Sequence, residues 1–123
     1  MRLLLDTQVF LWFISADERL SETVKEAIRD PANEVYLSAV SLWEALIKHQ
    51  LGKLPLPQPP QSYLPEQRQR HRITSLSVRE DDVAQLATLP PLHRDPFDRL
   101  LICQAKARDL TLVSSDRTVL AYP

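Results

Sequence analysis

Four acidic side chains interrupt apolar stretches that lie far apart along this chain. They are Asp6, Glu44, Asp98 and Asp116. A carboxylate is costly to bury unless it is paired or bound to a metal, so acids at the ends of several apolar elements indicate a shared cation site. Carboxylate oxygens are ligands that suit Mg²⁺ or Mn²⁺. The sequence therefore predicts one divalent metal site, with ligands that only folding brings together.

Each acid at the start of an element also has a structural alternative. Asp6 could cap a helix that begins near Gln8. Asp98 lies three residues after Asp95, where a carboxylate interacts favourably with the helix dipole in any case. Asp95 itself precedes a proline and is interpreted as an N-cap in preference to a ligand. Asp116 could cap the short segment 117–120.

The interpretation of Glu44 depends on which residue begins its helix. The spacing of Ser41 and Glu44 matches a capping box. Ser38 is the better start, because Val40 already belongs to the apolar pattern of the helix. The sequence therefore predicts Glu44 inside a helix, flanked by apolar residues.

Short apolar strands alternate with helices along the chain. We expect strands at 3–5, 35–37, 73–76 and 110–113, and helices at 9–14, 22–29, 39–50, 62–70, 78–86 and 96–107. The expected N-caps are Ser21, Ser38, Ser77 and Asp95, and Glu80, Asp81 and Asp82 are expected to form a solvated first turn. This alternation predicts an α/β layer structure with a mostly parallel sheet. Binding sites in such sheets form at the carboxyl ends of the strands, where Asp6 and Asp116 would lie.

The composition is that of a globular chain with no strong charge signal. The 123 residues fit a single domain, 1–123, and the net charge of −1 excludes a general attraction to nucleic acid. The apolar start of the chain is broken by Asp6, Thr7 and Gln8, so we expect neither a signal peptide nor a membrane span. The single cysteine, Cys103, excludes an intramolecular disulfide and is expected to be buried. A cytoplasmic protein is the resulting expectation.

Local basic clusters could still contact a polyanion. One comprises Arg68, Arg70, His71 and Arg72, and the other comprises His93, Arg94 and Arg99. Such side chains could contact phosphates without selecting a base sequence. The first cluster is interpreted in preference as a solvated helix face. Arg94 and Arg99 could instead pair with nearby carboxylates.

The order and spacing of these motifs resemble a PIN-domain ribonuclease of the VapC toxin type from end to end. Residues 2–7, RLLLDT, are similar to the opening strand of the family with its first acid. Residues 38–44, SAVSLWE, resemble the helix that supplies the glutamate. Residues 93–105, HRDPFDRLLICQA, are the most specific stretch and contain the third acid, Asp98. Residues 112–116, LVSSD, resemble the closing strand and final acid.

The resemblance implies a PIN-like three-layer α/β/α sandwich with a four- to five-stranded sheet, in which the last strand would span 119–122. It also implies an endoribonuclease that uses Mg²⁺ or Mn²⁺, a homodimer, and a cognate antitoxin as partner. Asp6 and Asp98 are expected to be the main metal ligands, with Glu44 and Asp116 completing the pocket directly or through water. Thr7 and Ser114 could hydrogen-bond a carboxylate, a metal-bound water or the RNA phosphate, or could act as local caps.

Two other classes remain open at this stage. A magnesium-dependent phosphatase acting on small phosphoesters could use Asp6 as nucleophile, but the second aspartate expected two residues later is replaced by Gln8. A non-catalytic module that binds RNA or an antitoxin could share the fold. The presence of all four acids argues against this module.

Some large apolar residues are expected in the core, although some of them could form a dimer face. They are Trp12, Phe13, Trp43 and Leu46.

Overall fold

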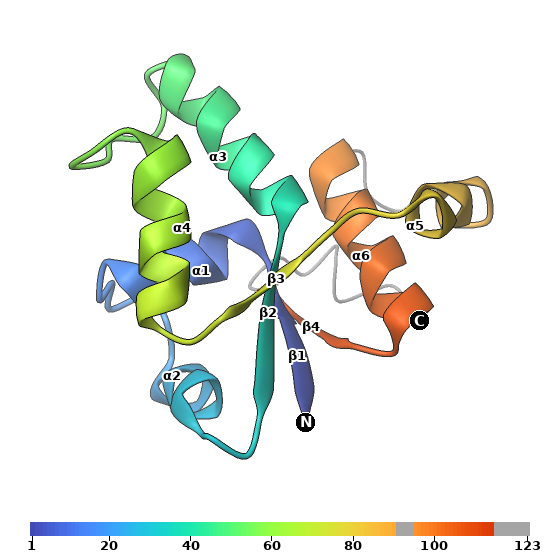
Figure 1. Cartoon of the computed structure of the whole chain (residues 1–123), viewed down its shortest axis with the longest axis horizontal. Helices are drawn as coiled ribbons and strands as arrows, with labels where there is room; N and C mark the ends of the chain where they lie inside the picture. The colour runs from blue at the N-terminus through green and yellow to red at the C-terminus, as the bar shows by residue number, and fades with distance from the viewer. Residues whose placement is uncertain (91–94, 115–123) are drawn as a thin grey trace.

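A parallel sheet forms the centre of the computed structural model, which describes residues 1–90 and 95–114 (Figure 1). Within those residues the sheet has four strands in the order β3-β2-β1-β4. The strands are β1 (Arg2–Leu5), β2 (Glu34–Ser38), β3 (Thr74–Leu76) and β4 (Thr111–Val113). All three strand pairings are parallel. The predicted parallel α/β sheet is confirmed, and the expected fifth strand at 119–122 lies outside the described residues.

Residues 3–5 of the interior strand β1 are all leucines, and helices cover both faces of this strand. Leu3 and Leu5 pack in one core cluster and Leu4 packs in another, and each is almost fully buried. A strand that is buried on both faces shows a continuous apolar run in place of an alternating pattern. The leucine run therefore determines that β1 occupies an interior position of the sheet.

Helices on the two faces complete the three layers. On one face, α1 (Thr7–Ile14), α2 (Glu22–Arg29) and α4 (Pro60–Arg70) contribute to the larger core cluster, whereas α6 (Pro96–Arg108) packs on the other face (Figure 1). The short helix α5 (Glu80–Ala84) and the 3₁₀ turn η1 (Gln85–Ala87) lie beside α6. Helix α3 (Ala39–Gln50) contributes to both clusters, through Ala45 on the larger one and Val40 on the other. The α/β/α sandwich expected from the resemblance is confirmed.

Three of the four predicted N-caps are confirmed. Ser21 Oγ accepts from the Val24 N–H at 3.2 Å, and Ser38 Oγ accepts from the Val40 N–H at 3.1 Å. Asp95 caps α6 through the backbone N–H groups of its first turn, with a proline next in the chain. Because α3 begins after Ser38, the alternative capping box at Ser41 is excluded.

The prediction for the helix at 78–86 was wrong at its start. Helix α5 begins at Glu80, with Arg79 as its N-cap, and not after Ser77. The Ser77 carbonyl instead accepts hydrogen bonds from Arg108, at 2.8 Å, and from Gln104, at 3.2 Å. Ser77, which the sequence pattern assigned as the N-cap, therefore contacts α6 instead.

The prediction of a solvated first turn in α5 is confirmed for Glu80 and Asp81, which are exposed, and is wrong for Asp82. Asp82 is only 1% exposed and lies 2.6 Å from the Arg108 guanidinium, and its carboxylate also accepts from the Arg79 N–H at 2.8 Å. Its second oxygen, Oδ1, lacks a hydrogen-bond partner among the described residues. Asp82 is buried because Arg108, 26 positions later and on a different helix, pairs with its carboxylate.

Two further features concern burial and membrane association. Cys103 is buried, as predicted. Within the described part of the chain, no helix has both the length and the apolar character needed to cross a bilayer.

Candidate active site

A cavity of about 480 Å³ opens beside the carboxyl end of β1. We call it the acid pocket, and its lining residues are Asp6, Thr7, Gln8, Leu11, Glu44, Lys48, Lys53, Leu54, Asp95 and Asp98. Three of the four acids singled out in the sequence therefore share one cavity, together with Asp95. The fourth, Asp116, lies outside the described residues.

Asp6 stands where β1 passes into α1. Its Oδ1 accepts a hydrogen bond from the Val9 N–H at 2.7 Å, so the acid caps α1 as well as lining the pocket. Its own N–H donates to the Val113 carbonyl at 3.0 Å, which ties the end of β4 to the end of β1. Ser114 follows Val113 and is half-buried. The two sequence interpretations of Asp6, cap and site residue, are therefore compatible.

Glu44 is buried in the middle of α3 and is held from two sides. Its Oε1 accepts from the Thr7 hydroxyl at 2.7 Å, and that hydroxyl lies 2.9 Å from Ser41 Oγ. Its Oε2 accepts from the Lys48 ammonium at 2.6 Å. Thr7 thus contacts a carboxylate of the acid pocket, which is one of the roles that the sequence left open for it.

Lys48 is a residue of this pocket that sequence reasoning missed. Burial alone would lower its pKa, but the hydrogen bond that Lys48 donates to Glu44 and the negative charges of Glu44, Asp95 and Asp98 raise it overall. Lys48 therefore carries a positive charge within the acid pocket. The signal was present in the sequence, since a glutamate and a lysine four residues apart meet on one face of a helix.

Asp95 and Asp98 enter the pocket from the first turn of α6. Asp95 Oδ1 accepts from the N–H groups of Phe97, at 2.9 Å, and Asp98, at 3.3 Å. The helix N-terminus carries partial positive charge, which favours both carboxylates at this position. Asp95 therefore has the capping role predicted for it while also facing the pocket.

The donor set of the acid pocket matches a hard divalent ion. Carboxylate oxygens are the ligands that Mg²⁺ and Mn²⁺ prefer, and Mg²⁺ commonly takes one or two carboxylates and completes its shell with water. Across residues 1–90 and 95–114, no group of three or more His, Cys, Asp or Glu side chains is arranged to hold a metal. The carboxylates that line the acid pocket fit such an ion by the chemistry of their oxygen donors.

The arginines of the first basic cluster lie at the other end of the sheet. A second cavity, of about 380 Å³, is lined by Arg29, Arg70, His71 and Arg72 together with the start of β2. Arg70 pairs with Glu66 at 3.2 Å, and Arg68 donates to the Ile73 carbonyl at 3.2 Å. These residues are therefore not brought to the acid pocket.

The second basic cluster is described only in part. Arg99 is half-buried in the first turn of α6, close in sequence to Asp98. His93 and Arg94 lie outside the described residues. Of this cluster, the structure thus places Arg99 alone, on the helix that carries Asp95 and Asp98.

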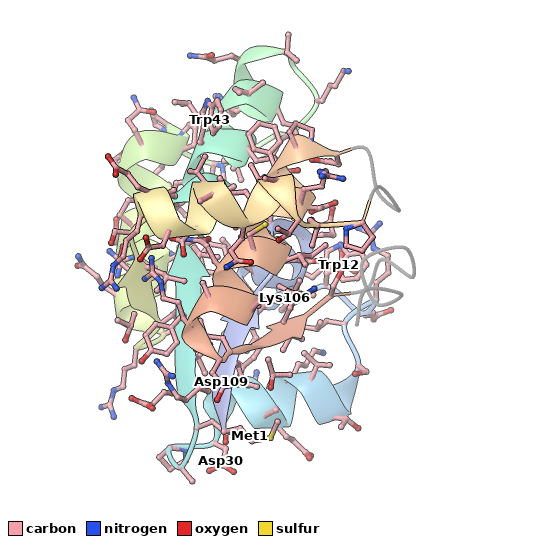
Figure 2. The ribbon with its side chains drawn as sticks, turned by 90° about the vertical axis from the view of Figure 1, so that its right-hand side faces the viewer. Met1, Trp12, Asp30, Trp43, Lys106 and Asp109 are labelled. Atoms are coloured by element: carbon pink, nitrogen blue, oxygen red, sulfur yellow. The ribbon has the colours of Figure 1, made fainter. Side chains whose placement is uncertain are left out.

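One aromatic residue expected in the core is exposed. Trp43, which Figure 2 labels, is 55% exposed on α3. Its ring packs edge-on against that of Phe97 of α6, with ring centroids 4.8 Å apart. Phe13 is buried as predicted, while Trp12 and Leu46 are half-buried. Helical spacing could not distinguish a core position from an exposed one at the junction of two helices.

An apolar groove adjoins the acid pocket. It is a cavity of about 330 Å³ lined by Gln8, Leu11, Trp12, Ile14, Ser15, Asp17, Arg19, Leu54, Pro55, Leu56, Pro57 and Tyr63. Gln8, Leu11 and Leu54 line both cavities, so the two lie next to each other. The Arg19 guanidinium lies over the Trp12 ring, 4.9 Å from its centroid, at the charged side of this groove.

Comparisons with known proteins agree with this architecture. Ribonuclease VapC16 of Mycobacterium tuberculosis is 41% identical over 63 residues, which cover 51% of this chain and 44% of that protein. The chain thus spans less than half the length of this relative.

Two solved structures share the fold at 17% identity each. The structure of VapBC2 from Rickettsia felis bound to a promoter DNA fragment gives a TM-score of 0.68, covering 94% of this chain and 88% of the other. The structure of VapBC-1 from nontypeable Haemophilus influenzae gives a TM-score of 0.65, covering 98% of this chain and 90% of the other. A model of the PIN domain matches residues 3–122. The chain belongs to the PIN domain family.

Proposed function

We propose that this protein is an endoribonuclease dependent on Mg²⁺ or Mn²⁺, acting in the cytoplasm as the toxin of a toxin–antitoxin pair. The observation that carries this proposal is the acid pocket, in which Asp6, Glu44 and Asp98 line one cavity although they come from three separate elements. Membership of the PIN domain family and the partial similarity to a VapC ribonuclease support the assignment.

The acids have distinct roles in the proposed site. Asp6 and Asp98 hold the ion, and Glu44 and Asp116 complete the pocket directly or through water. A bound divalent ion would lower the pKa of a water and offset charge that develops on the phosphate. Thr7 keeps Glu44 in place, and Ser114, next to the backbone contact between Asp6 and Val113, is proposed to bind a water or the phosphate.

The proposed reaction is hydrolysis of an RNA phosphodiester. The oxygen of a water bonds to phosphorus as the water gives up a proton, the bond between phosphorus and the 3′ oxygen breaks, and the 3′ oxygen takes up one proton, so that the net change is the addition of one water. The products carry a 5′-phosphate and a 3′-hydroxyl. Lys48 and Lys53 place positive charge among the acids that line the pocket, which would favour the approach of the polyanion.

An assay on two substrates tests this function. The purified protein is incubated with structured RNA and with p-nitrophenyl phosphate, each with Mg²⁺, Mn²⁺ or EDTA. RNA cleavage that needs the metal and leaves 5′-phosphate ends is expected. Release of nitrophenol without RNA cleavage would indicate a phosphatase, and RNA binding without cleavage would indicate a binding module. A 2′,3′-cyclic phosphate product would exclude the proposed chemistry.

The groove beside the acid pocket is proposed to receive the antitoxin. Its lining is largely apolar, with Leu11, Trp12 and Tyr63 among its residues, and because it lies next to the pocket a bound segment would block access to the acids. The partner would therefore present an apolar segment. Co-purification with the small protein from the neighbouring reading frame is expected, and Tyr63→Lys should abolish it. Unchanged complex formation by Tyr63→Lys would place the antitoxin elsewhere.

A homodimer is proposed through the face around Trp43. An exposed tryptophan stacked on Phe97 offers a large apolar area. Sedimentation should give a dimer for the wild type and a monomer for Trp43→Lys. Leu51→Lys, at another exposed apolar residue, is the matched control and should remain dimeric. A dimeric Trp43→Lys would exclude this face.

Basic residues are proposed to guide the RNA. Arg99, His93 and Arg94 belong to or adjoin α6, the helix that carries Asp98, and would contact phosphates near the reaction. Farther from the acid pocket, the RNA strand would be contacted by Arg68, Arg70 and Arg72. The cavity lined by Arg29, Arg70 and Arg72 supports this second contact region.

A further inference from the structure

The ion pair between Glu44 and Lys48 differs from the other pairs within helices. In α4, Arg70 and Glu66 are also four residues apart, but their side chains are 63% and 55% exposed. Glu44 has a side chain only 5% exposed, whereas Lys48 remains 47% exposed. An exposed pair contributes little to stability because water screens it, but a buried carboxylate depends on its partner. The buried Glu44 carboxylate therefore depends on the Lys48 ammonium as its charged partner.

Both oxygens of Glu44 are already bound to the protein. Thr7 of α1 donates to Oε1, and Lys48 of α3 donates to Oε2 at 2.6 Å. A metal that approached Glu44 directly would have to compete with an ammonium group already in contact with it. Asp6 and Asp98 line the same cavity from other elements.

The Lys48 ammonium also offsets part of the negative charge of the acid pocket. Asp6, Glu44, Asp95 and Asp98 all line this cavity, and like charges in one cavity repel one another. We propose that Lys48 is a positioning residue that serves as the internal counter-cation of the acid pocket. It holds Glu44 in place and weakens the binding of the divalent ion. This inference rests on the metal-dependent function proposed above.

Lys48→Met tests the inference because it removes the charge while keeping a side chain of similar length. We expect Mn²⁺ to bind about tenfold more tightly, since one repelling charge is gone. Affinity is measured by electron paramagnetic resonance of free Mn²⁺ and by calorimetry. At saturating Mn²⁺, RNA cleavage should nevertheless be slower, because Glu44 has lost one of its two fixed contacts. A merely structural lysine would lower the melting temperature equally with and without Mn²⁺, leaving Mn²⁺ affinity unchanged.

Three control variants make the result specific. Lys48→Arg keeps the charge and should retain an affinity close to that of the wild type. Lys25→Met removes a lysine paired with Glu22 on α2, outside the acid pocket, and should leave Mn²⁺ affinity unchanged. Lys53→Met removes a charge from the same cavity and should tighten binding less than Lys48→Met. If Lys48→Met does not fold, Lys48→Gln provides a second uncharged variant.

The outcomes separate this inference from the proposed function. Unchanged or weaker Mn²⁺ binding by the uncharged variants, or equal tightening by Lys53→Met, would overturn the role of Lys48 even if the wild type cleaves RNA. Tighter Mn²⁺ binding in a protein that cleaves no RNA would support the counter-cation and refute the nuclease. Absence of Mn²⁺ binding by the wild type would overturn both.

Discussion

The Thr7 hydroxyl donates a hydrogen bond of 2.7 Å to Glu44 Oε1, joining the first residue of α1 to the middle of α3. Both side chains are about 5% exposed or less. A buried carboxylate without its donor costs about 1–3 kcal/mol, so this contact stabilises the fold as well as the position of Glu44. The two residues lie 37 positions apart, and the end of β1 and the end of β2 bring them together.

Replacing Thr7 by valine should therefore affect stability and activity together. Thr7→Val preserves the shape of the side chain and removes the hydroxyl. The free energy of unfolding, measured with urea, should fall by about 1–3 kcal/mol, and metal-dependent RNA cleavage should slow. Thr88→Val is the matched control, because the Thr88 hydroxyl bonds an exposed turn carbonyl. A Thr7→Val protein as stable and active as the wild type would show that this contact is dispensable.

Asp6→Asn and Asp98→Asn should abolish RNA cleavage without unfolding the protein. Asparagine retains an oxygen that can cap α1 through the Val9 N–H, so the fold should survive the first change. Mg²⁺ should raise the melting temperature of the wild type, by relieving repulsion among the acids, and this increase should disappear in both variants. Scanning fluorimetry with Mg²⁺ or EDTA measures it. Equal wild-type melting temperatures in both conditions would count against the metal site.

Arg108→Met should be strongly destabilising. It leaves Asp82 buried beside α6 without its cation, and breaking a buried pair in this way typically costs about 3–5 kcal/mol. Urea unfolding measures the loss. Adding Asp82→Asn to the same chain should restore part of the stability, since the buried charge is then removed while an oxygen remains for the Arg79 N–H. A mild effect of the single change would indicate that Asp82 is solvated after all.

Stability should decline as the pH falls below about 6.5 because of His71. Burial lowers the pKa of His71 from its ordinary value of 6.5, and the nearby charges of Arg70 and Arg29 lower it further. The unfolded chain therefore binds a proton at a pH where the folded protein does not. Stability is fully present above 6.5 and is lost as the pH falls through the lowered pKa. Urea midpoints from about pH 8 to about pH 5 should show a smaller slope for His71→Gln than for the wild type.

Arg72→Gln should weaken RNA binding through the loss of one phosphate contact. Arg72 has a positive φ of 58° at the end of α4 and lines the cavity at the far edge of the sheet. In a plot of log affinity against log salt concentration, the magnitude of the slope should fall by about 0.7 for a single-stranded RNA. Lys106→Gln removes an exposed charge on α6 and should leave this slope unchanged. Equal effects of the two substitutions would mean that RNA does not contact this cavity.

Local signals in the sequence predicted most of the elements. Ser21, Ser38 and Asp95 marked the starts of their helices, because each side chain accepts a hydrogen bond from a backbone N–H only two or three residues later. The leucines of β1 indicated an interior strand for an equally local reason. Element type depends on neighbours within a few residues, so a single sequence is sufficient to predict it.

Tertiary packing decided the details that involve distant partners. Asp82 looked like a surface acid because nothing near it in the sequence reveals Arg108, which reaches it from another helix. Trp43 looked like a core residue because helical periodicity does not show that α6 covers only one side of it. Such outcomes depend on how the helices pack against one another.

The sequence alone determined which acids were candidates and placed Asp6 at the carboxyl edge of a parallel sheet, because Asp6 directly follows a buried strand and sites in such sheets form at that edge. Only the tertiary structure decided that Glu44 is held by Thr7 and by Lys48, and that the arginines of α4 lie away from the acids. Hydrogen bonds and charge pairs require atoms within a few ångströms, and that proximity follows from folding, not from order along the chain.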